Sequence, residues 1–206
     1  MTPPACRRIV WAALALACPA SALAAEPEIR SFAVTVDGRP AGTFTMTARP
    51  GPDGTETVEM AADIRVRILA VKYTYELKST EVWKGATLVS LDASCNDDGK
   101  RKQARAANRA GVLTSTGWRE PARRDAPSQV AVVDVDDGSE SAARAEPHPA
   151  SRVAVGGKAV EARRYKIKGS AIDAEWWFDA DGCPVRQEMT SDGHKVVLTL
   201  TAVARK

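Results

Sequence analysis

Residues 55–82 read TETVEMAADIRVRILAVKYTYELKSTEV, and apolar and polar residues alternate along almost the whole stretch. Because side chains of a β-strand point to opposite faces with a period of two, this alternation predicts long antiparallel strands with one covered and one solvated face. The apolar parity switches at Leu69-Ala70, which predicts a bend or tight reversal between two strands. Ile64–Ile68 and Val71–Leu77 would then face the same apolar side.

The first 24 residues have the features of a secretory signal peptide. Arg7-Arg8 precede a short apolar run, Ile9–Cys18, and Ala22-Leu23-Ala24 supplies the small residues of a signal-peptidase site. The apolar run is shorter than the ~20 residues of a bilayer-spanning helix. A cytoplasmic helix, a twin-arginine signal and lipidation of Cys18 are weaker interpretations. We therefore expect an exported, periplasmic protein, cleaved near Ala24, with no transmembrane span in the mature chain.

The charge balance gives no indication of nucleic-acid binding. The chain has 29 Lys and Arg against 26 Asp and Glu, and loss of Arg7 and Arg8 with the leader leaves a formal charge of about +1. One basic stretch, Lys100–Arg109, has no aromatic residue among its charges. It is typical of a solvated strand face, with contact to phosphate or lipid headgroups as the alternative.

Short strands separated by turn sequences follow one another through most of the mature chain. Asp37-Gly38, Asn96–Gly99 and Ser191–Gly193 are examples of these turns, which favour an antiparallel meander, closed or half-closed. Between residues 119 and 152 Pro, Ser, Asp, Arg and Ala predominate, and we expect a surface loop with a short strand or helical turn there. The sequence predicts one all-β, mainly antiparallel domain over residues 25–206, with little helix apart from the leader.

Two cysteines, Cys95 and Cys183, remain after cleavage. Each lies beside a turn sequence, and disulfides persist outside the cytoplasm. We expect a bond between them, because a closed loop of this length would stabilise the fold by about 4 kcal/mol in the chain-entropy model. A metal or redox pair is the alternative, although the chain contains no CxxC sequence.

Residues typical of catalytic or metal sites are scarce. His148 lies between two prolines, and His194 lies at the expected start of a strand. A Ser-His-Asp arrangement around His194 stays open, because such partners meet only in the fold, but no GxSxG sequence accompanies it. Asp134–Gly138 resembles part of a calcium loop, yet its Gly is at the fifth position and Ala145 is at the twelfth. We predict no catalytic residue, no metal ligand and no cofactor.

The tryptophans that follow the leader are Trp83, Trp118, Trp176 and Trp177. Trp176 and Trp177 are adjacent, so they face opposite sides of one strand. Ala174 and Phe178 share the parity of Trp176, which makes that side the apolar one. We expect the tryptophans to pack in the core, with Trp118 and Trp177 as the exceptions that cover an outer face or meet a ligand.

Several strand-and-turn segments together resemble those of exported bacterial proteins classified only as a domain of unknown function. The segments are Tyr73–Glu76, Thr80–Gly85, Leu88–Asp92, Asn96–Lys100, Tyr165–Gly169 and Trp177–Gly182. That family is in turn similar to the half-barrel of periplasmic lipoprotein carriers. The resemblance implies a meander sheet curled into a half-barrel around an apolar concavity, which suits a lipid-like ligand or a partner's acyl chain. Cys95, Cys183 and the segment beyond Trp118 depart from the family pattern.

The interpretation we prefer is a non-enzymatic periplasmic protein that binds a hydrophobic or lipid-like ligand, or an acylated partner, in the half-barrel concavity. Burial of an acyl chain would drive binding, at about 0.8 kcal/mol per methylene. The lining residues would include Ile64, Val66, Tyr73, Tyr75 and Trp118. Two alternatives stay open: a structural or interaction module of an envelope complex with a filled core, and an enzyme on the same scaffold that acts on a small molecule.

Overall fold

Thirteen β-strands make up most of the described part of the chain. The computed structural model describes residues 26–51, 53–68, 71–122 and 125–205, so the leader expected over residues 1–24 lies outside it. Among the described residues, there is no helix of sufficient length and apolarity to cross a bilayer. The strands are β1 Glu28–Val36, β2 Arg39–Pro50, β3 Thr55–Ile68, β4 Val71–Lys84, β5 Thr87–Asp97, β6 Lys100–Ala110, β7 Val112–Thr114, β8 Ser128–Val133, β9 Glu140–Val155, β10 Lys158–Gly169, β11 Asp173–Phe178, β12 Pro184–Ser191 and β13 His194–Arg205.

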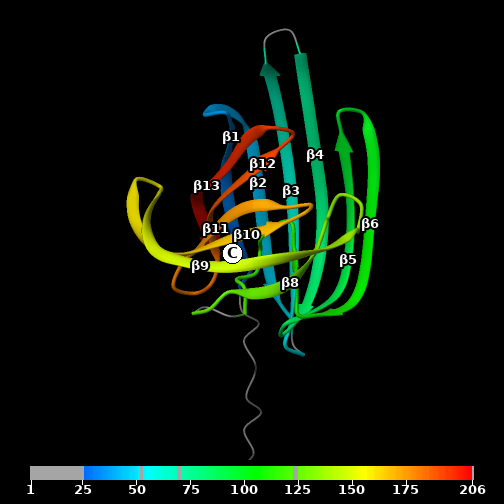
Figure 1. Ribbon diagram of the computed structural model, residues 1–206, viewed down its shortest axis with the longest axis vertical. Coiled ribbons are helices and arrows are strands. Elements are labelled where there is room, and N and C mark those ends of the chain that lie inside the picture. The colour runs from blue at the N-terminus through cyan, green and yellow to red at the C-terminus, as the bar shows by residue number, and fades with distance from the viewer. Residues whose placement is uncertain (1–25, 52, 69–70, 123–124, 206) are drawn as a thin grey trace, which may run out of the picture.

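All thirteen strands belong to one curled sheet, in the order β6-β5-β4-β3-β2-β1-β13-β12-β11-β10-β9-β8-β7. Strand pairs are antiparallel except β7 with β8, which is parallel. Figure 1 shows β8–β11 running at a steep angle to β2–β6, so that the sheet nearly closes into a barrel with one seam left unsealed. The predicted all-β, mainly antiparallel, curled meander is therefore confirmed.

The decisive stretch forms a long hairpin of β3 and β4. Its ladder runs from the pair Thr55–Lys84 to the pair Ile68–Val71, which confirms the reversal predicted at Leu69-Ala70, two residues that lie outside the described part. Regular pairing with β2 ends at Ile64, and pairing with β5 ends at Tyr75. The end of the hairpin therefore projects beyond its neighbours (Figure 1).

The inner face of the sheet is filled by two pieces of the chain itself, Val112–Trp118 and Val130–Asp136, which we call the interior segments. Their side chains alternate between two apolar clusters, as expected for strands covered on both faces. Val112 and Val133 pack in the larger cluster, with the inner face of β1–β6 and with β13. Leu113 and Val132 pack in the smaller one, against β9–β11. Residues 119–152 are thus more ordered than expected, since they contain β8 and most of β9.

The predicted disulfide is not formed, because both cysteines are free. Cys95 lies near Asp97 and Asp136, whereas Cys183 lies near Arg30 and Glu56. Cys95 pairs with Leu77 of β4, and Leu77 pairs with Ala62 of β3. Glu56 lies six residues away from Ala62 on β3, or about 20 Å at the rise of a strand. A disulfide needs Cα atoms within about 7 Å, so this separation excludes it. Burial raises the pKa of each thiol to about 11.

Candidate functional site

Four of the five predicted lining residues lie together near the projecting end of the β3–β4 hairpin. Ile64 pairs with Tyr75 across the ladder, and Val66 pairs with Tyr73. All four side chains point to the inner side of the sheet and are half-buried. Ile64 and Tyr75 also pack against the larger core cluster. We call these four residues the hairpin face; it is a continuous apolar strip, because directly paired residues on one face lie within about 5.5 Å of each other.

Trp118 does not belong to this face, so its prediction as a cavity residue is corrected. It follows β7 and is only 6% exposed, within the larger core. Its Nε1 donates to Oε2 of Glu56 at 3.4 Å, near the opposite end of β3 from Val66. The separation along that strand is about 30 Å. Trp118 therefore packs in the core, as the other tryptophans do.

Trp177 also lies in the core, although it faces away from Trp176 as predicted. It is 6% exposed, and its Nε1 donates to the hydroxyl of Ser151 at 2.9 Å. The guanidinium groups of Arg164 and Arg186 lie 5.3 and 5.7 Å from its ring. Each guanidinium is itself paired, with Glu175 and Glu188. Trp177 is therefore buried within the larger cluster, and these contacts leave little of it for a ligand.

Polar groups border the hairpin face on the side of β5, β6 and the second interior segment. The Tyr73 hydroxyl donates to Asp97 at 2.9 Å, and Lys102 lies 3.3 Å from the same carboxylate. Burial acts to raise the pKa of Asp97, but these two hydrogen bonds outweigh it and hold that pKa below its usual value. The Tyr75 hydroxyl donates to Asp136 at 2.7 Å. Burial raises the pKa of Asp136 and of both phenols, which stay neutral donors at physiological pH.

A buried carboxyl, Glu81, fastens the first interior segment to β4. It is 0% exposed, and Trp83 Nε1 donates to its Oε2 at 2.8 Å. The hydroxyls of Thr114 and Thr116 lie 3.2 and 3.0 Å from its oxygens and 2.8 Å from each other. These three oxygen–oxygen contacts need three hydrogens, and the hydroxyls supply two. A protonated Glu81 supplies the third.

The pKa of Glu81 agrees with that count. Burial raises it from its ordinary value to about 7, against the opposing effect of the hydrogen bonds and of Arg119. Since no part of its side chain reaches the surface, Glu81 has a structural role and cannot contact a substrate. The sequence contains a sign of this buried carboxyl. Glu81 occupies the same set of alternate, inward-facing positions as Tyr75, Leu77 and Trp83, where a charged residue is unusual.

Gln187 is the second buried side chain that holds the first interior segment against the sheet. Its Nε2 donates to the carbonyl oxygens of Thr116 and Gly117, at 2.8 and 3.3 Å, from a side chain that is fully buried. Gly117 has φ +62°, and a Cβ there would lie 2.8 Å from Gln187 Nε2 and 2.9 Å from Trp176. The close approach of sheet and segment therefore depends on a glycine.

The contacts of His194 and the position of His148 form no Ser-His-Asp arrangement in the described part of the chain. His194 Nδ1 lies 2.7 Å from Asp37, which also accepts a hydrogen bond from the Lys195 amide. The contact with His194 is the main cause of the lowered pKa of Asp37. This contact between His194 and Asp37 joins the β1–β2 turn to the β12–β13 turn. No serine hydroxyl among the described residues bonds to His194, and His148 lies on β9 opposite Arg164.

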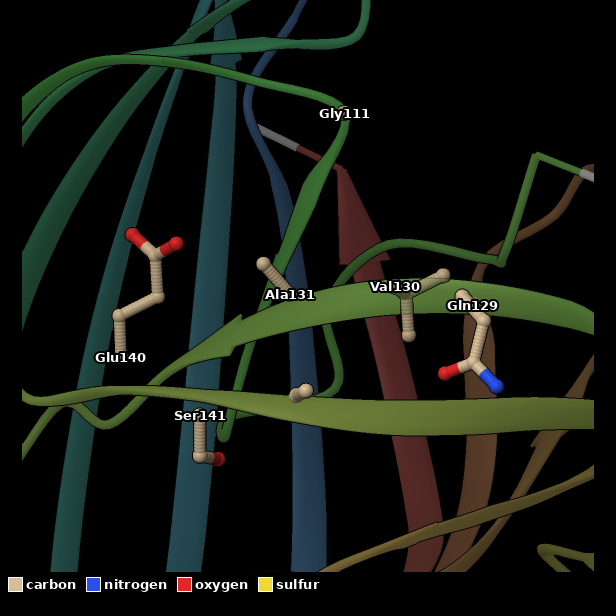
Figure 2. A pocket seen from close by; sticks show the side chains of 7 residues that line it. Gly111, Gln129, Val130, Ala131, Glu140 and Ser141 are labelled. Atoms are coloured by element: carbon tan, nitrogen blue, oxygen red, sulfur yellow. The ribbon is translucent and has the colours of Figure 1, made fainter.

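Among the hollows on the surface of the described residues are two shallow ones, and neither of these includes a residue of the hairpin face. The first, of about 350 Å³, is shown in Figure 2 and is lined by Gly111, Gln129, Val130, Ala131, Glu140, Ser141 and Ala142. The second, of about 400 Å³, is lined by Thr45, Thr47, Glu59, Met60, Ala61, Lys78, Ser79, Thr80, Asp92 and Ser94 of β2–β5. Among the described residues, no cluster of three or more His, Cys, Asp or Glu is suited to a metal ion.

Comparisons with known proteins give a family and a fold. A family model described as a domain of unknown function, DUF6134, matches residues 32–201. A solved β-barrel-like protein of the domain of unknown function DUF1849 from Brucella abortus is similar over 90% of this chain and 100% of that chain, with a TM-score of 0.60 and 10% sequence identity. A DUF1329 family protein from Desulfovibrio piger, at 11% identity over 90% of this chain and 87% of that chain, has a TM-score of only 0.28. None of the curated proteins matches in sequence.

Proposed function

The chain belongs to the DUF6134 family, a domain of unknown function as its resemblances indicated, and from that premise we propose that it is a non-enzymatic periplasmic protein that binds the apolar chain of a lipid-like ligand or an acylated partner. The ligand would lie along the hairpin face. The β-barrel-like architecture supports the proposal only at the level of fold.

The observation that carries the proposal is the half-exposed state of the hairpin face. Ile64, Val66, Tyr73 and Tyr75 are contiguous across the ladder, yet the interior segments do not cover them fully as they cover the rest of the inner face. An acyl chain laid along the strip would gain about 0.8 kcal/mol for each methylene that it buries. Few polar groups are needed to orient such a ligand.

Lys102 and its neighbours provide a polar end for the same site. The Lys102 ammonium is partly exposed beside Asp97, and the Tyr73 hydroxyl shares that carboxylate. An amphipathic ligand would place its charged or hydroxylated end at this rim and its chain along Val66 and Tyr73. The site would therefore lie at one end of the barrel, because Glu81 and Gln187 hold the deeper interior closed.

The filled interior favours a second function, an interaction module of an envelope complex. Both apolar clusters are built from the chain's own side chains, and the interior segments contribute to each of them. A module of this kind would need no ligand for stability. It differs from the first proposal in one measurable property, since it would bind no fatty acid.

Binding of cis-parinaric acid to the purified protein from residue 26 onward tests the first proposal. Val66→Glu puts a charge in the hairpin face and is expected to weaken binding by tenfold or more, because it loses about 1.5 kcal/mol of apolar contact and adds a desolvated carboxylate. Thr74→Glu, on the exposed side of the neighbouring strand, is the matched control and is expected to change binding less than twofold.

Absence of saturable binding by a folded protein would contradict the ligand proposal and favour the interaction module. Native mass spectrometry of the protein recovered from a periplasmic extract supplies a second readout, in which a co-purifying lipid supports the proposal. N-terminal sequencing of that material tests cleavage near Ala24. An N-terminus upstream of that position, in the cytoplasmic fraction, would contradict the periplasmic assignment.

A further inference from the structure

The end of the β3–β4 hairpin extends beyond the rest of the sheet. Regular pairing of β3 with β2 ends at Ile64, and regular pairing of β4 with β5 ends at Tyr75. The ladder between β3 and β4 continues for four more residue pairs, which carry the hairpin about 13 Å beyond its neighbours. We call residues 65–68 and 71–74 the projecting end; in Figure 1 it rises above the ends of β1, β2, β5 and β6.

The projecting end is basic on its outer face. Its charged residues are Arg65, Arg67 and Lys72, all of them exposed, and it contains no acidic residue. Val66 and Tyr73 of the hairpin face lie on the opposite side of the same two strands, because side chains alternate between the faces. The projecting end is therefore an amphipathic hairpin, with cations on one side and half-buried apolar side chains on the other.

Two of these cations face each other directly. Arg67 pairs with Lys72 across the ladder, so their Cβ atoms lie within about 5.5 Å. Arg65 bonds the carboxylate of Asp63 at 3.0 and 3.2 Å. By contrast, no carboxylate of the described residues forms an ion pair with Arg67 or Lys72. Like charges directly opposite each other destabilise a ladder, and an anionic partner would remove that repulsion.

We propose that the projecting end docks on the surface of an anionic phospholipid bilayer. The phosphates would lie beside the basic outer face, and Val66 and Tyr73 would lie where the headgroups meet the acyl chains. Anionic bilayers attract clustered Lys and Arg side chains, and Tyr is enriched at this boundary. The inference goes beyond the proposed function, since docking of this kind needs no ligand on the hairpin face.

The size and the two faces of the projecting end favour a bilayer over an acidic protein. A stable protein–protein interface covers about 800 Å² on each partner, whereas the projecting end offers three cations on two short pieces of strand. A protein partner would also need a separate apolar surface for Val66 and Tyr73, which face the other way. A bilayer supplies phosphates and acyl chains within about 10 Å of each other, so both faces find their complement in it.

Cosedimentation of the purified protein from residue 26 onward with lipid vesicles tests the proposal. It is expected to bind phosphatidylcholine vesicles that contain about one-third phosphatidylglycerol at least tenfold more tightly than pure phosphatidylcholine, because each basic side chain near an anionic surface strengthens binding about fivefold. Raising the salt from about 0.1 M to about 1 M shortens the screening length from ~10 Å to ~3 Å and should abolish the difference. Equal binding to both vesicles at low salt would overturn the proposal, as would tighter binding to a poly-glutamate peptide than to the anionic vesicles.

Charge reversal supplies the matched variants. Arg67→Glu combined with Lys72→Glu is expected to weaken binding to the anionic vesicles by tenfold or more. Arg101→Glu combined with Arg105→Glu changes the net charge equally on exposed residues of β6 and should leave that binding within twofold. If the first variant does not fold, Arg67→Ser combined with Lys72→Ser removes the same charges and should still weaken binding by about tenfold. Equal losses at the two positions would overturn the proposal.

Binding of cis-parinaric acid separates this inference from the proposed ligand site. The side chains of Arg67 and Lys72 face away from the hairpin face, so their charge reversal should leave fatty-acid binding in place. Loss of vesicle docking in a parent protein that binds the fatty acid would overturn this inference alone. Vesicle docking by a protein that binds no fatty acid would support it and contradict the ligand proposal.

Discussion

At Glu81 the fold keeps a carboxyl in a place where its charged form is disfavoured. Its pKa is about 7 in the folded protein against an ordinary 4.5. A raised folded-state pKa contributes stability that is complete below about pH 4.5 and is lost as the pH rises through about 7. The difference corresponds to roughly 3 kcal/mol over that window.

Replacement Glu81→Gln should therefore remove a pH dependence. The amide matches the protonated carboxyl, because it has one acceptor oxygen for Trp83 and hydrogens to donate toward Thr114 or Thr116. We expect urea unfolding to show the variant more stable than the parent by roughly 1–3 kcal/mol at pH 8, and little different at pH 5. Glu76→Gln, exposed on the opposite face of β4, is the control. Parallel pH profiles for parent and Glu81→Gln would contradict the assignment.

Gly117 is the second residue where one side chain decides the packing. A Cβ there would meet Gln187 and Trp176 at less than 3 Å, and the positive φ adds strain. Gly117→Ala is expected to lower the free energy of unfolding by about 2–4 kcal/mol. Gly85→Ala has a similar φ of +55° with nothing within 4 Å, and it should lose only about 1 kcal/mol. Equal losses in chemical denaturation would show that contact with the sheet is unimportant.

Arg30 joins two elements, since it lies on β1 and bonds the turn between β11 and β12. It is 4% exposed, with Glu28 at 2.6 Å, Asp179 at 3.0 Å and the Pro184 carbonyl oxygen at 3.2 Å. Arg30→Met would remove this buried cation from Asp179 and Glu28, of which Glu28 keeps its ion pair with Arg205 at 3.1 Å.

The expected loss for Arg30→Met is about 3–5 kcal/mol in thermal or urea unfolding at pH 7. Arg65→Met is the matched control, because Arg65 pairs with Asp63 on the surface and should lose less than about 1 kcal/mol. A loss for Arg30→Met no greater than that of the control would mean that packing alone holds the turn to β1.

The strands whose extent could be predicted from the sequence are those with one buried and one solvent-exposed face. β3 and β4 alternate strictly, so their extent and reversal follow from residues 55–82. β7 and β8 are covered on both faces, so Val130–Val135 has no alternation that would distinguish a strand from a loop. The length of β9 was hidden for another reason, since Pro147 and Pro149 lie within it at a position where pairing with β10 is irregular.

The candidate site was likewise predictable only where a local sequence pattern indicated it. The hairpin face followed from parity, whereas Trp118 was placed in it without a view of where the chain after β7 runs. That course depends on Glu81, Gln187 and Gly117, which are far apart in sequence and meet only in the fold. Glu81 alone left a local signal, in its inward parity.

For the molecule as a whole, the free state of Cys95 and Cys183 predicts stability without a covalent cross-link. Thiol titration of the denatured protein from residue 26 onward should count two free thiols without reductant. In the native state their reaction should be slow, since burial raises both pKa values to about 11 and disfavours the thiolate. Reductant should leave the unfolding midpoint unchanged. A count near zero without reductant would restore the predicted disulfide.

The order of strands in the sheet has a consequence for the sequence of folding events. Every ladder joins strands adjacent along the chain except that of β1 with β13, where Glu28 meets Arg205. As the polypeptide emerges from a ribosome or a translocation pore, each local hairpin can form at once, but one edge of β1 waits for the last strand. During that interval Phe32 and Val34 lack their partners Leu200 and Leu198. An unpaired strand edge promotes aggregation, so the nascent chain is most vulnerable at its first strand, and synthesis of β13 ends that exposure.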